Sequence, residues 1–276
     1  LALAAFNQRD FAKATTLGET SARLFSNNPL RRNNVALFAM YSGDFLAAQR
    51  HAQQAMSLRP SFEKAAMTWA LSSAAAGAYD EARAGYERIY ALSSLGRFFS
   101  TAGLSDLALL RGRPADAVLA LGRAMAAEAS SDESRARLTV TLAEARMAQG
   151  RAADGADLAI AAAQLSDSPA VRYLALSVLL AAGRQPEAAR IAALPLPAGS
   201  EMRMMLKLMD GEVQLAKGNP TEALTRFREA VTFADSWLAR LALGRAYLAT
   251  GALADAQIEF DQCLKRRGEA TAVFLD

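Results

Sequence analysis

Two stretches near the C-terminus, GNPTEALTRFREA at residues 218–230 and GALADAQIEFDQC at residues 251–263, share one pattern. In both, a glycine is followed by alanine five positions later and by phenylalanine nine positions later. The two glycines are 33 residues apart, 251 − 218. The unit recurs upstream as GRQPEAA from 183, GRAADGA from 150, GRPADAV from 112, GAYDEAR from 77, GDFLAAQ from 43 and RDFAKAT from 9. The successive spacings from 9 to 251 are 34, 34, 35, 38, 33, 35 and 33, and such a period predicts a solenoid of repeated units.

Each unit is predicted to consist of two helices. The first helix ends at the glycine, which adopts a left-handed backbone conformation without steric cost, and Arg9 stands in the glycine's place in the first unit. The second helix begins one to three residues later. Pro114, Pro186 and Pro220 sit where a first-turn proline is tolerated, and Asn219 with Glu222 is predicted to form a capping box.

Small residues recur at one place in the second helix of each unit, where close helix crossings require them. They are Ala48, Ala82, Ala117, Ala188, Ala223 and Ala256. Phe227 and Phe260, four residues further on, are expected to fill the space beside the crossing. In the unit at 136–168, Gly155 replaces the alanine, which makes this the least regular unit.

Composition favours an all-α fold. The chain has 276 residues, of which 52% are hydrophobic and only 7% aromatic, and much of the apolar content is alanine, the strongest helix former. Runs of β-branched residues with alternating polarity are missing from the sequence. The apolar content is sufficient for a sizeable core.

The units resemble the tetratricopeptide repeat family. The last unit supplies that family's characteristic residues as Leu243, Gly244, Tyr247, Gly251, Ala256 and Phe260, with Cys263 where alanine is usual. The second unit ends with Ala48, Ala55 and Pro60 in register. The resemblance covers nearly all of the chain, in seven complete units and one truncated first unit. It implies a right-handed superhelical solenoid of antiparallel helix pairs, whose first helices line a concave groove that binds proteins or peptides.

On this basis residues 1–276 are interpreted as a single solenoid domain. The expected units are approximately 1–28, 29–62, 63–97, 98–135, 136–168, 169–203, 204–236 and 237–270, with 271–276 beginning another. The polar link 128–135 is predicted to be a loop. A solenoid needs a polar cap at each end, and neither end of this sequence has one. We therefore interpret the chain as a fragment of a larger bacterial protein. Its ends are expected to expose apolar residues, namely Leu1, Leu3, Phe6, Val273 and Phe274.

Several function classes receive no support from the sequence. Phosphate-binding loops, dinucleotide-binding motifs and hydrolase motifs are missing, so neither an enzyme nor a cofactor is predicted. The net charge is only +3 and the arginines are spread along the chain, which argues against nucleic acid. The single histidine, His51, is expected to be a surface or packed residue rather than a metal ligand, and the single cysteine, Cys263, is expected to be buried and inert. No membrane-spanning run is visible, and the compartment stays open between cytoplasm and periplasm.

The family resemblance assigns groove positions on the first helix of each unit. The candidate peptide-groove residues are Asn34, Lys64, Asp106, Arg137, Glu144, Tyr173, Met205, Leu208, Met209, Glu212 and Arg245, with Leu248 at the end of the series. Asn34 and Lys64 fall at two of the five positions of the family's carboxylate clamp, too few to predict that specificity.

Four methionines, Met202, Met204, Met205 and Met209, crowd the entry of one first helix, and because they cannot all face one point a metal site is not predicted. Met202 and Met204 are interpreted as packing residues. Met205 and Met209 share one helix face, so they are expected to form an apolar site with Tyr173 and Leu208, unless a neighbouring part of the solenoid covers them.

Two hypotheses remain for the function of the chain. The first hypothesis is a non-enzymatic protein- or peptide-binding scaffold. The second is a structural or sensory arm of a bacterial signalling protein that acts by homo-association or by controlling another domain.

Overall fold

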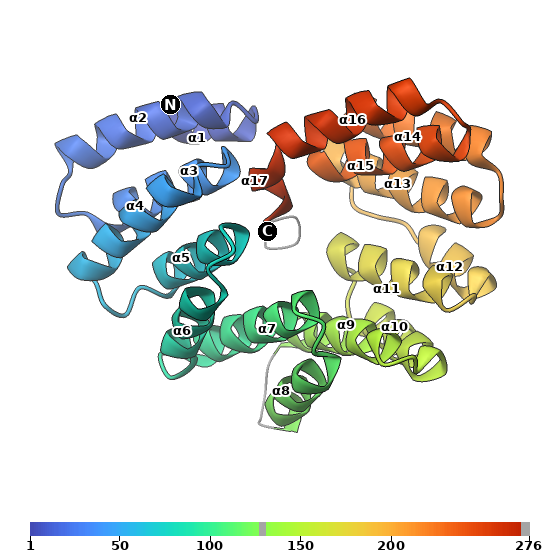
Figure 1. Cartoon of the computed structure of the whole chain (residues 1–276), viewed down its shortest axis with the longest axis horizontal. Helices are drawn as coiled ribbons and strands as arrows, with labels where there is room; N and C mark the ends of the chain where they lie inside the picture. Colours follow the sequence, from blue (N-terminus) through green and yellow to red (C-terminus); the bar gives the residue numbers. More distant parts are fainter. Residues whose placement is uncertain (127–130, 272–276) are drawn as a thin grey trace. The chain divides into compact units, whose positions relative to one another are not determined.

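The computed structural model describes residues 1–126 and 131–271, and these residues form 17 helices and no strand. Sixteen of the helices alternate as the first and second members of eight antiparallel pairs (Figure 1). The first members are α1 (Ala2–Asn7), α3 (Pro29–Tyr41), α5 (Glu63–Ala75), α7 (Ser94–Leu110), α9 (Asp132–Ala148), α11 (Pro169–Ala181), α13 (Ser200–Ala216) and α15 (Trp237–Ala249). The second members are α2 (Phe11–Leu24), α4 (Phe45–Leu58), α6 (Tyr79–Tyr90), α8 (Pro114–Ala126), α10 (Ala152–Leu165), α12 (Gln185–Ala192), α14 (Pro220–Phe233) and α16 (Leu253–Lys265), followed by the short α17 (Arg267–Ala270). The predicted all-α repeat architecture is confirmed, and α1, with 6 residues, is shorter than the other first helices.

The chain divides into two compact units within helix α7. Unit 1 contains residues 1–107 together with 266–276, and unit 2 contains residues 108–265. Each unit is a stack in which helices that follow one another in sequence pack together, as α3 does against α4 and α13 against α14. The expectation of one continuous solenoid domain stays a prediction.

The turn between the two helices of each pair has the predicted left-handed residue. Glycine occupies it in seven pairs with φ between 67° and 82°, from Gly43 to Gly251. In the first pair the residue is Arg9, with φ 60°. The hydrogen bonds are the same in both cases, because Arg9 N–H donates to Phe6 O as Gly43 N–H donates to Met40 O. Arg9 therefore adopts the glycine's conformation, as the repeat alignment predicts.

The small residues of the second helices are buried as predicted. Ala48, Ala82, Ala117, Ala188 and Ala223 are fully buried, and Ala256 is 2% exposed. In the last two pairs a phenylalanine lies directly on a glycine of the first helix. A Cβ added to Gly211 would stand 2.3 Å from Phe227, and one added to Gly244 would stand 2.6 Å from Phe260. These positions determine how closely the helices approach.

Two local predictions are wrong. The predicted loop 128–135 ends early, because α9 already begins at Asp132. Ser131 caps this helix by accepting a hydrogen bond from the Ser134 N–H. Residues 127–130 lie outside the described residues. The predicted capping box at α14 does not form, because Asn219 makes no side-chain cap. Its amide instead donates to Gln214, and Glu222 pairs with Arg226 at 2.7 Å.

At the N-terminal end of unit 1, the expectation of exposed apolar residues holds only in part. Leu1 and Leu3 are 97% and 60% exposed. Phe6, however, is partly buried among aromatic rings, with centroids 4.9 to 5.4 Å from those of Phe11, Phe38 and Tyr41. The short helix α1 is thus anchored by aromatic contacts. Val273 and Phe274 lie outside the described residues.

Candidate functional site

All the candidate groove residues lie on first helices of the pairs. In unit 1 they are Asn34 on α3, Lys64 on α5 and Asp106 on α7. In unit 2 they are Arg137 and Glu144 on α9, Tyr173 on α11, Met205, Leu208, Met209 and Glu212 on α13, and Arg245 on α15. The repeat alignment therefore places every candidate on a first helix. The contacts described below show which of these residues lie together.

Unit 2 brings three of the candidates into one polar cluster. Glu212 is 6% exposed, and its Oε1 accepts a hydrogen bond from the Tyr173 hydroxyl at 3.2 Å and from Arg245 Nη1 at 2.8 Å. The three side chains come from α11, α13 and α15, which are the first helices of three successive pairs. We call Tyr173, Glu212 and Arg245 the carboxylate cluster.

The surroundings of Tyr173 in the carboxylate cluster keep its hydroxyl protonated. Burial, and then the negative charge of Glu212, raise the pKa of Tyr173 well above its usual range. The phenol therefore stays a hydrogen-bond donor at neutral pH, and it donates to the Glu212 carboxylate. A buried carboxylate that accepts from two donors is held in a single position.

Arg245 is the exposed member of the cluster. Its side chain is 48% exposed, whereas the side chain of its partner Glu212 is only 7% exposed. A guanidinium has five N–H donors in a rigid planar fork, and the bond to Glu212 uses only Nη1. Leu248 lies one turn further along α15 and is 54% exposed. The arrangement presents a fixed cation and an apolar side chain to solvent on one helix face.

The expected methionine site is not open to solvent. Leu208 and Met209 are fully buried, and Met205 and Tyr173 are each 7% exposed. These side chains fill space between neighbouring helices, which agrees with the alternative that other parts of the solenoid cover them. Met204 is also buried, as expected, and its sulfur lies 3.1 Å from the Ser236 hydroxyl. The structure thus assigns Leu208 and Met209 to the packed interior, because neither side chain is exposed to solvent.

Of the remaining candidates, Arg137 and Glu144 lie on α9 of unit 2, and the other three lie in unit 1. Arg137 is half-buried and pairs along its own helix with Glu133, Nε to Oε1 at 2.8 Å. Glu144 is half-buried on the same helix. In unit 1, Lys64 and Asp106 are exposed, and Asn34 lies at an open pocket of about 340 Å³ with mainly apolar walls that include Leu3, Leu24 and Phe38.

The lone histidine and cysteine behave as packing residues. The His51 ring is mostly buried with Nε2 3.7 Å from Glu19, and its pKa is lowered by burial. Cys263 is a buried free thiol 3.7 Å from the Trp237 carbonyl oxygen. Within the described residues, no group of three His, Cys, Asp or Glu side chains is arranged to hold a metal ion. Nor does any helix in those ranges have the length and apolar character to cross a membrane.

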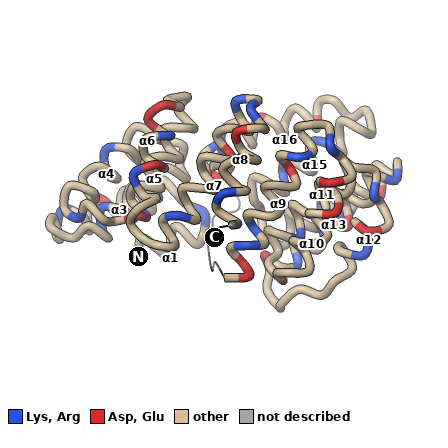
Figure 2. The backbone as a smooth tube through the Cα atoms, turned by 90° about the horizontal axis from the view of Figure 1, so that it is seen from below, with Lys and Arg blue, Asp and Glu red and all other residues tan. Residues whose placement is uncertain are grey.

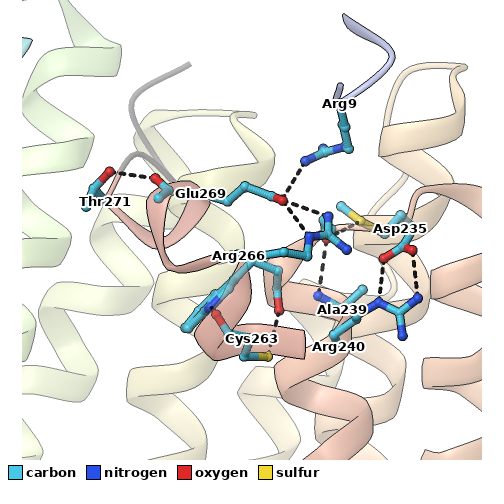
Figure 3. A network of polar contacts seen from close by, with 12 residues as sticks. Arg9, Asp235, Ala239, Arg240, Cys263, Arg266, Glu269 and Thr271 are labelled. Carbon is cyan, nitrogen blue, oxygen red and sulfur yellow. Dashed lines mark hydrogen bonds and ion pairs between the residues drawn. The ribbon is translucent and has the colours of Figure 1, made fainter. Parts of the chain in front are cut away.

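Sequence reasoning missed one set of polar residues in unit 1. Arg9, Arg266 and Glu269 form an ion-pair cluster that joins positions 260 residues apart (Figure 3). The only sequence signal was the replacement of the turn glycine by Arg9. No repeat position indicates where such a side chain finds its partner.

These features define the class of protein: an all-helical repeat protein built from stacked antiparallel helix pairs. Residues 208–269 match the family model of the tetratricopeptide repeat. The chain contains tetratricopeptide repeats, and its fold is that of the tetratricopeptide-repeat solenoids. No curated protein sequence matches the chain significantly.

Solved structures share this fold at low sequence identity. A tetratricopeptide repeat protein from Parabacteroides merdae is 12% identical with a TM-score of 0.58, over 89% of this chain and 95% of that one. The human IFIT1 dimer with m7Gppp-AAAA is 13% identical with a TM-score of 0.56, over 92% and 68%. The APC/C hetero-tetramer Cut9–Hcn1 is 15% identical with a TM-score of 0.54, over 86% and 48%. At these identities the likeness concerns the fold alone.

Proposed function

We propose that this chain is a non-catalytic scaffold that binds an acidic peptide segment of another protein along the first helices of unit 2. Tetratricopeptide repeats serve in general as protein-interaction scaffolds without catalytic activity. The observation that carries the proposal is the carboxylate cluster. Glu212 holds the Arg245 guanidinium in place, and about half of that side chain faces solvent.

The chemistry of the ligand follows from the exposed groups. A guanidinium fork held by one buried carboxylate is suited to a second carboxylate, because its remaining N–H donors are oriented in advance. Leu248 lies one turn away and offers an apolar contact. We therefore expect a peptide with an aspartate, a glutamate or a free C-terminal carboxylate close to an apolar side chain.

The charge distribution favours a peptide over nucleic acid. Lys and Arg residues are interspersed with Asp and Glu along the backbone in Figure 2. Several cations of unit 2 are engaged in ion pairs, such as Lys207 with Glu229 at 2.5 Å and Arg226 with Asp210 at 2.9 Å. Nucleic-acid binding depends on basic patches that neutralise several phosphates together. Paired charges of this kind do not provide such a patch.

The test is selection from a phage-displayed library of random peptides, followed by titration of a selected synthetic peptide. We expect selected peptides to share a carboxylate, and Arg245→Ala to weaken binding about tenfold or more, because a hydrogen bond between charged groups contributes about 1.5–3 kcal/mol. The matched control is Arg190→Ala, which removes an exposed arginine from the second helix α12. Circular dichroism should be unchanged in both variants. If the selected peptides bind Arg245→Ala as tightly as the wild-type chain, the proposal fails.

A further inference from the structure

In the first helix pair of unit 1, the turn carries an energetic penalty that the other turns avoid. Arg9 adopts φ 60°, where seven other pairs have glycine. A non-glycine residue in this conformation costs about 1–2 kcal/mol. The side chain of Arg9 reaches Glu269, with Nη1 2.9 Å from Oε2. Arginine at this turn places a cation at the edge of unit 1, where the short helix α17 docks.

The carboxylate of Glu269 is the centre of the contact. Glu269 is 4% exposed, and its oxygens also accept from Arg266, Nε to Oε1 at 2.6 Å and Nη2 to Oε2 at 2.9 Å. Figure 3 shows the carboxylate between the two guanidinium groups. Since a buried charge that loses its partners is costly, this arrangement specifies a glutamate at this position.

The two residues before Glu269 contact the same region of unit 1. Gly268 lies directly on the end of α3, where an added Cβ would stand 2.3 Å from Met40 O and 2.4 Å from Tyr41 O. The Arg267 guanidinium lies over the Phe45 ring, 5.5 Å from its centroid. Three consecutive residues thus make an aromatic, a close backbone and an ionic contact. We call Arg9, Met40–Gly43 and Phe45 the docking surface, and residues 266–270 the docking segment.

The connection between the docking surface and the docking segment runs through the whole of unit 2. The surface lies within residues 1–107, the segment begins at Arg266, and residues 108–265 belong to unit 2. The segment contains only the four-residue helix α17. Its release would break the ionic and ring contacts but none of the hydrogen bonds within helices α1 to α16. The contact is therefore separable from the folding of the helix pairs.

We propose that the docking surface is an exchangeable self-association site, which binds either the chain's own docking segment or the docking segment of a second copy. Reciprocal exchange buries the same glutamate and the same glycine contact twice, so it forms a closed two-fold dimer without new contact chemistry. Dilution favours the intramolecular contact, and high concentration or opening of the segment favours exchange.

The test uses two charge-reversed variants of the full chain. Arg9→Glu places a carboxylate opposite Glu269, and Glu269→Arg places a cation opposite Arg9. In each variant positions 9 and 269 therefore have like charges, and the docking surface does not pair with a docking segment of the same variant. In a mixture, each surface meets a segment of opposite charge on the other variant. We expect the equimolar mixture to form a heterodimer in sedimentation velocity with one variant fluorescently labelled, and its Kd to be at least tenfold lower than for either variant alone.

The double variant Arg9→Glu with Glu269→Arg is the matched control. It restores the opposite charges within one chain and has the same arginine beside Arg266 as the single variant. We expect it to associate as the wild-type chain does. If the mixture associates no more than its two components, the docking segment is a permanent part of unit 1 and the proposal is overturned.

A second measurement tests the proposal without the charge-reversed variants, and it applies if those variants fail to fold. Gly268→Leu adds a side chain where no space exists beside Met40 O, so it vacates the docking surface without changing a charge. A labelled synthetic peptide of residues 261–271 is the probe. It should bind the Gly268→Leu chain at least tenfold tighter than the wild-type chain, and a peptide that itself carries Gly268→Leu should not bind. Equal binding of the first peptide to both chains, or its failure to bind the Gly268→Leu chain, overturns the proposal.

Discussion

Helix pairs α13/α14 and α15/α16 fill the space between their helices differently from pair α9/α10. In the last two pairs the first helix contributes a glycine and the second a phenylalanine, nine residues after the turn: Gly211 with Phe227, and Gly244 with Phe260. In α9/α10 the residue nine positions after the turn is Ala159. There the second helix contributes Gly155, and Met147 on the first helix lies against it.

In both kinds of pair the two helices approach too closely for an added Cβ, but the large residue lies on the second helix in one kind and on the first helix in the other. An added Cβ at Gly155 would lie 2.9 Å from the Met147 sulfur, and one at Gly211 would lie 2.3 Å from Phe227. The first pair of the chain uses a third solution. Gly18 occupies the phenylalanine's place, and a Cβ added there would lie 3.1 Å from Phe38 of the next pair. At these four contacts one residue is small and the other large, whereas their assignment to helices varies.

The largest expected effect that tests this comparison is that of Gly211→Ala. Phe227 is fully buried, and the added Cβ would lie 2.3 Å from its ring, so the ring or one of the two helices has to shift. Overpacking of this kind costs about 1–3 kcal/mol, and the better helix propensity of alanine offsets about 1 kcal/mol at most. We expect a net decrease in the free energy of unfolding, measured by urea denaturation followed by circular dichroism.

Gly122→Ala is the matched control for this variant. Gly122 lies on α8 with nothing within 4 Å of an added Cβ. The substitution keeps the propensity gain and adds no contact, so it should raise stability by up to about 1 kcal/mol. A Gly211→Ala chain that is stabilised as much as Gly122→Ala would show that Phe227 does not determine the helix spacing.

Gly155→Ala sharpens the comparison at an intermediate magnitude. The nearest neighbour is the flexible and half-buried Met147 side chain, but Ala143 O lies 3.0 Å from the added Cβ and belongs to the backbone. Methionine adapts its conformation more readily than a buried aromatic ring. We expect a loss of stability smaller than that of Gly211→Ala. Met147→Ala in the same chain should recover part of the loss, and an additive double variant would mean that the two residues do not share this space.

The sequence was sufficient to predict the repeat architecture, because each turn and each crossing depends on residues close together in the chain. The left-handed turn needs glycine, and the crossing needs a small residue such as Ala223. Even Arg9 was predicted at its turn from the period alone. Local spacing does not give the angle at which successive pairs stack, and contacts between pairs depend on that angle.

The candidate site illustrates the same limit. Tyr173, Glu212 and Arg245 were predicted from the repeat position, but their joining through one buried carboxylate was not. Leu208 and Met209 occupy first-helix positions of the same series but are fully buried, and the repeat position alone does not distinguish them from exposed positions such as Leu248. The Arg9–Glu269 pair spans 260 residues and has no counterpart in other repeats from which to infer it.

The smallest expected effect is that of Gly18→Ala, the third solution to the packing problem. The added Cβ would lie 3.1 Å from Phe38 and 3.2 Å from Val35, so each neighbour has to move by only a few tenths of an ångström. The crowding and the propensity gain of about 1 kcal/mol are therefore of similar size, and we expect the free energy of unfolding to stay within about 0.5 kcal/mol of the wild-type value. A loss as large as that of Gly211→Ala would mean that Phe38 is held as rigidly as Phe227. Contacts between successive pairs would then be as tight as those within a pair.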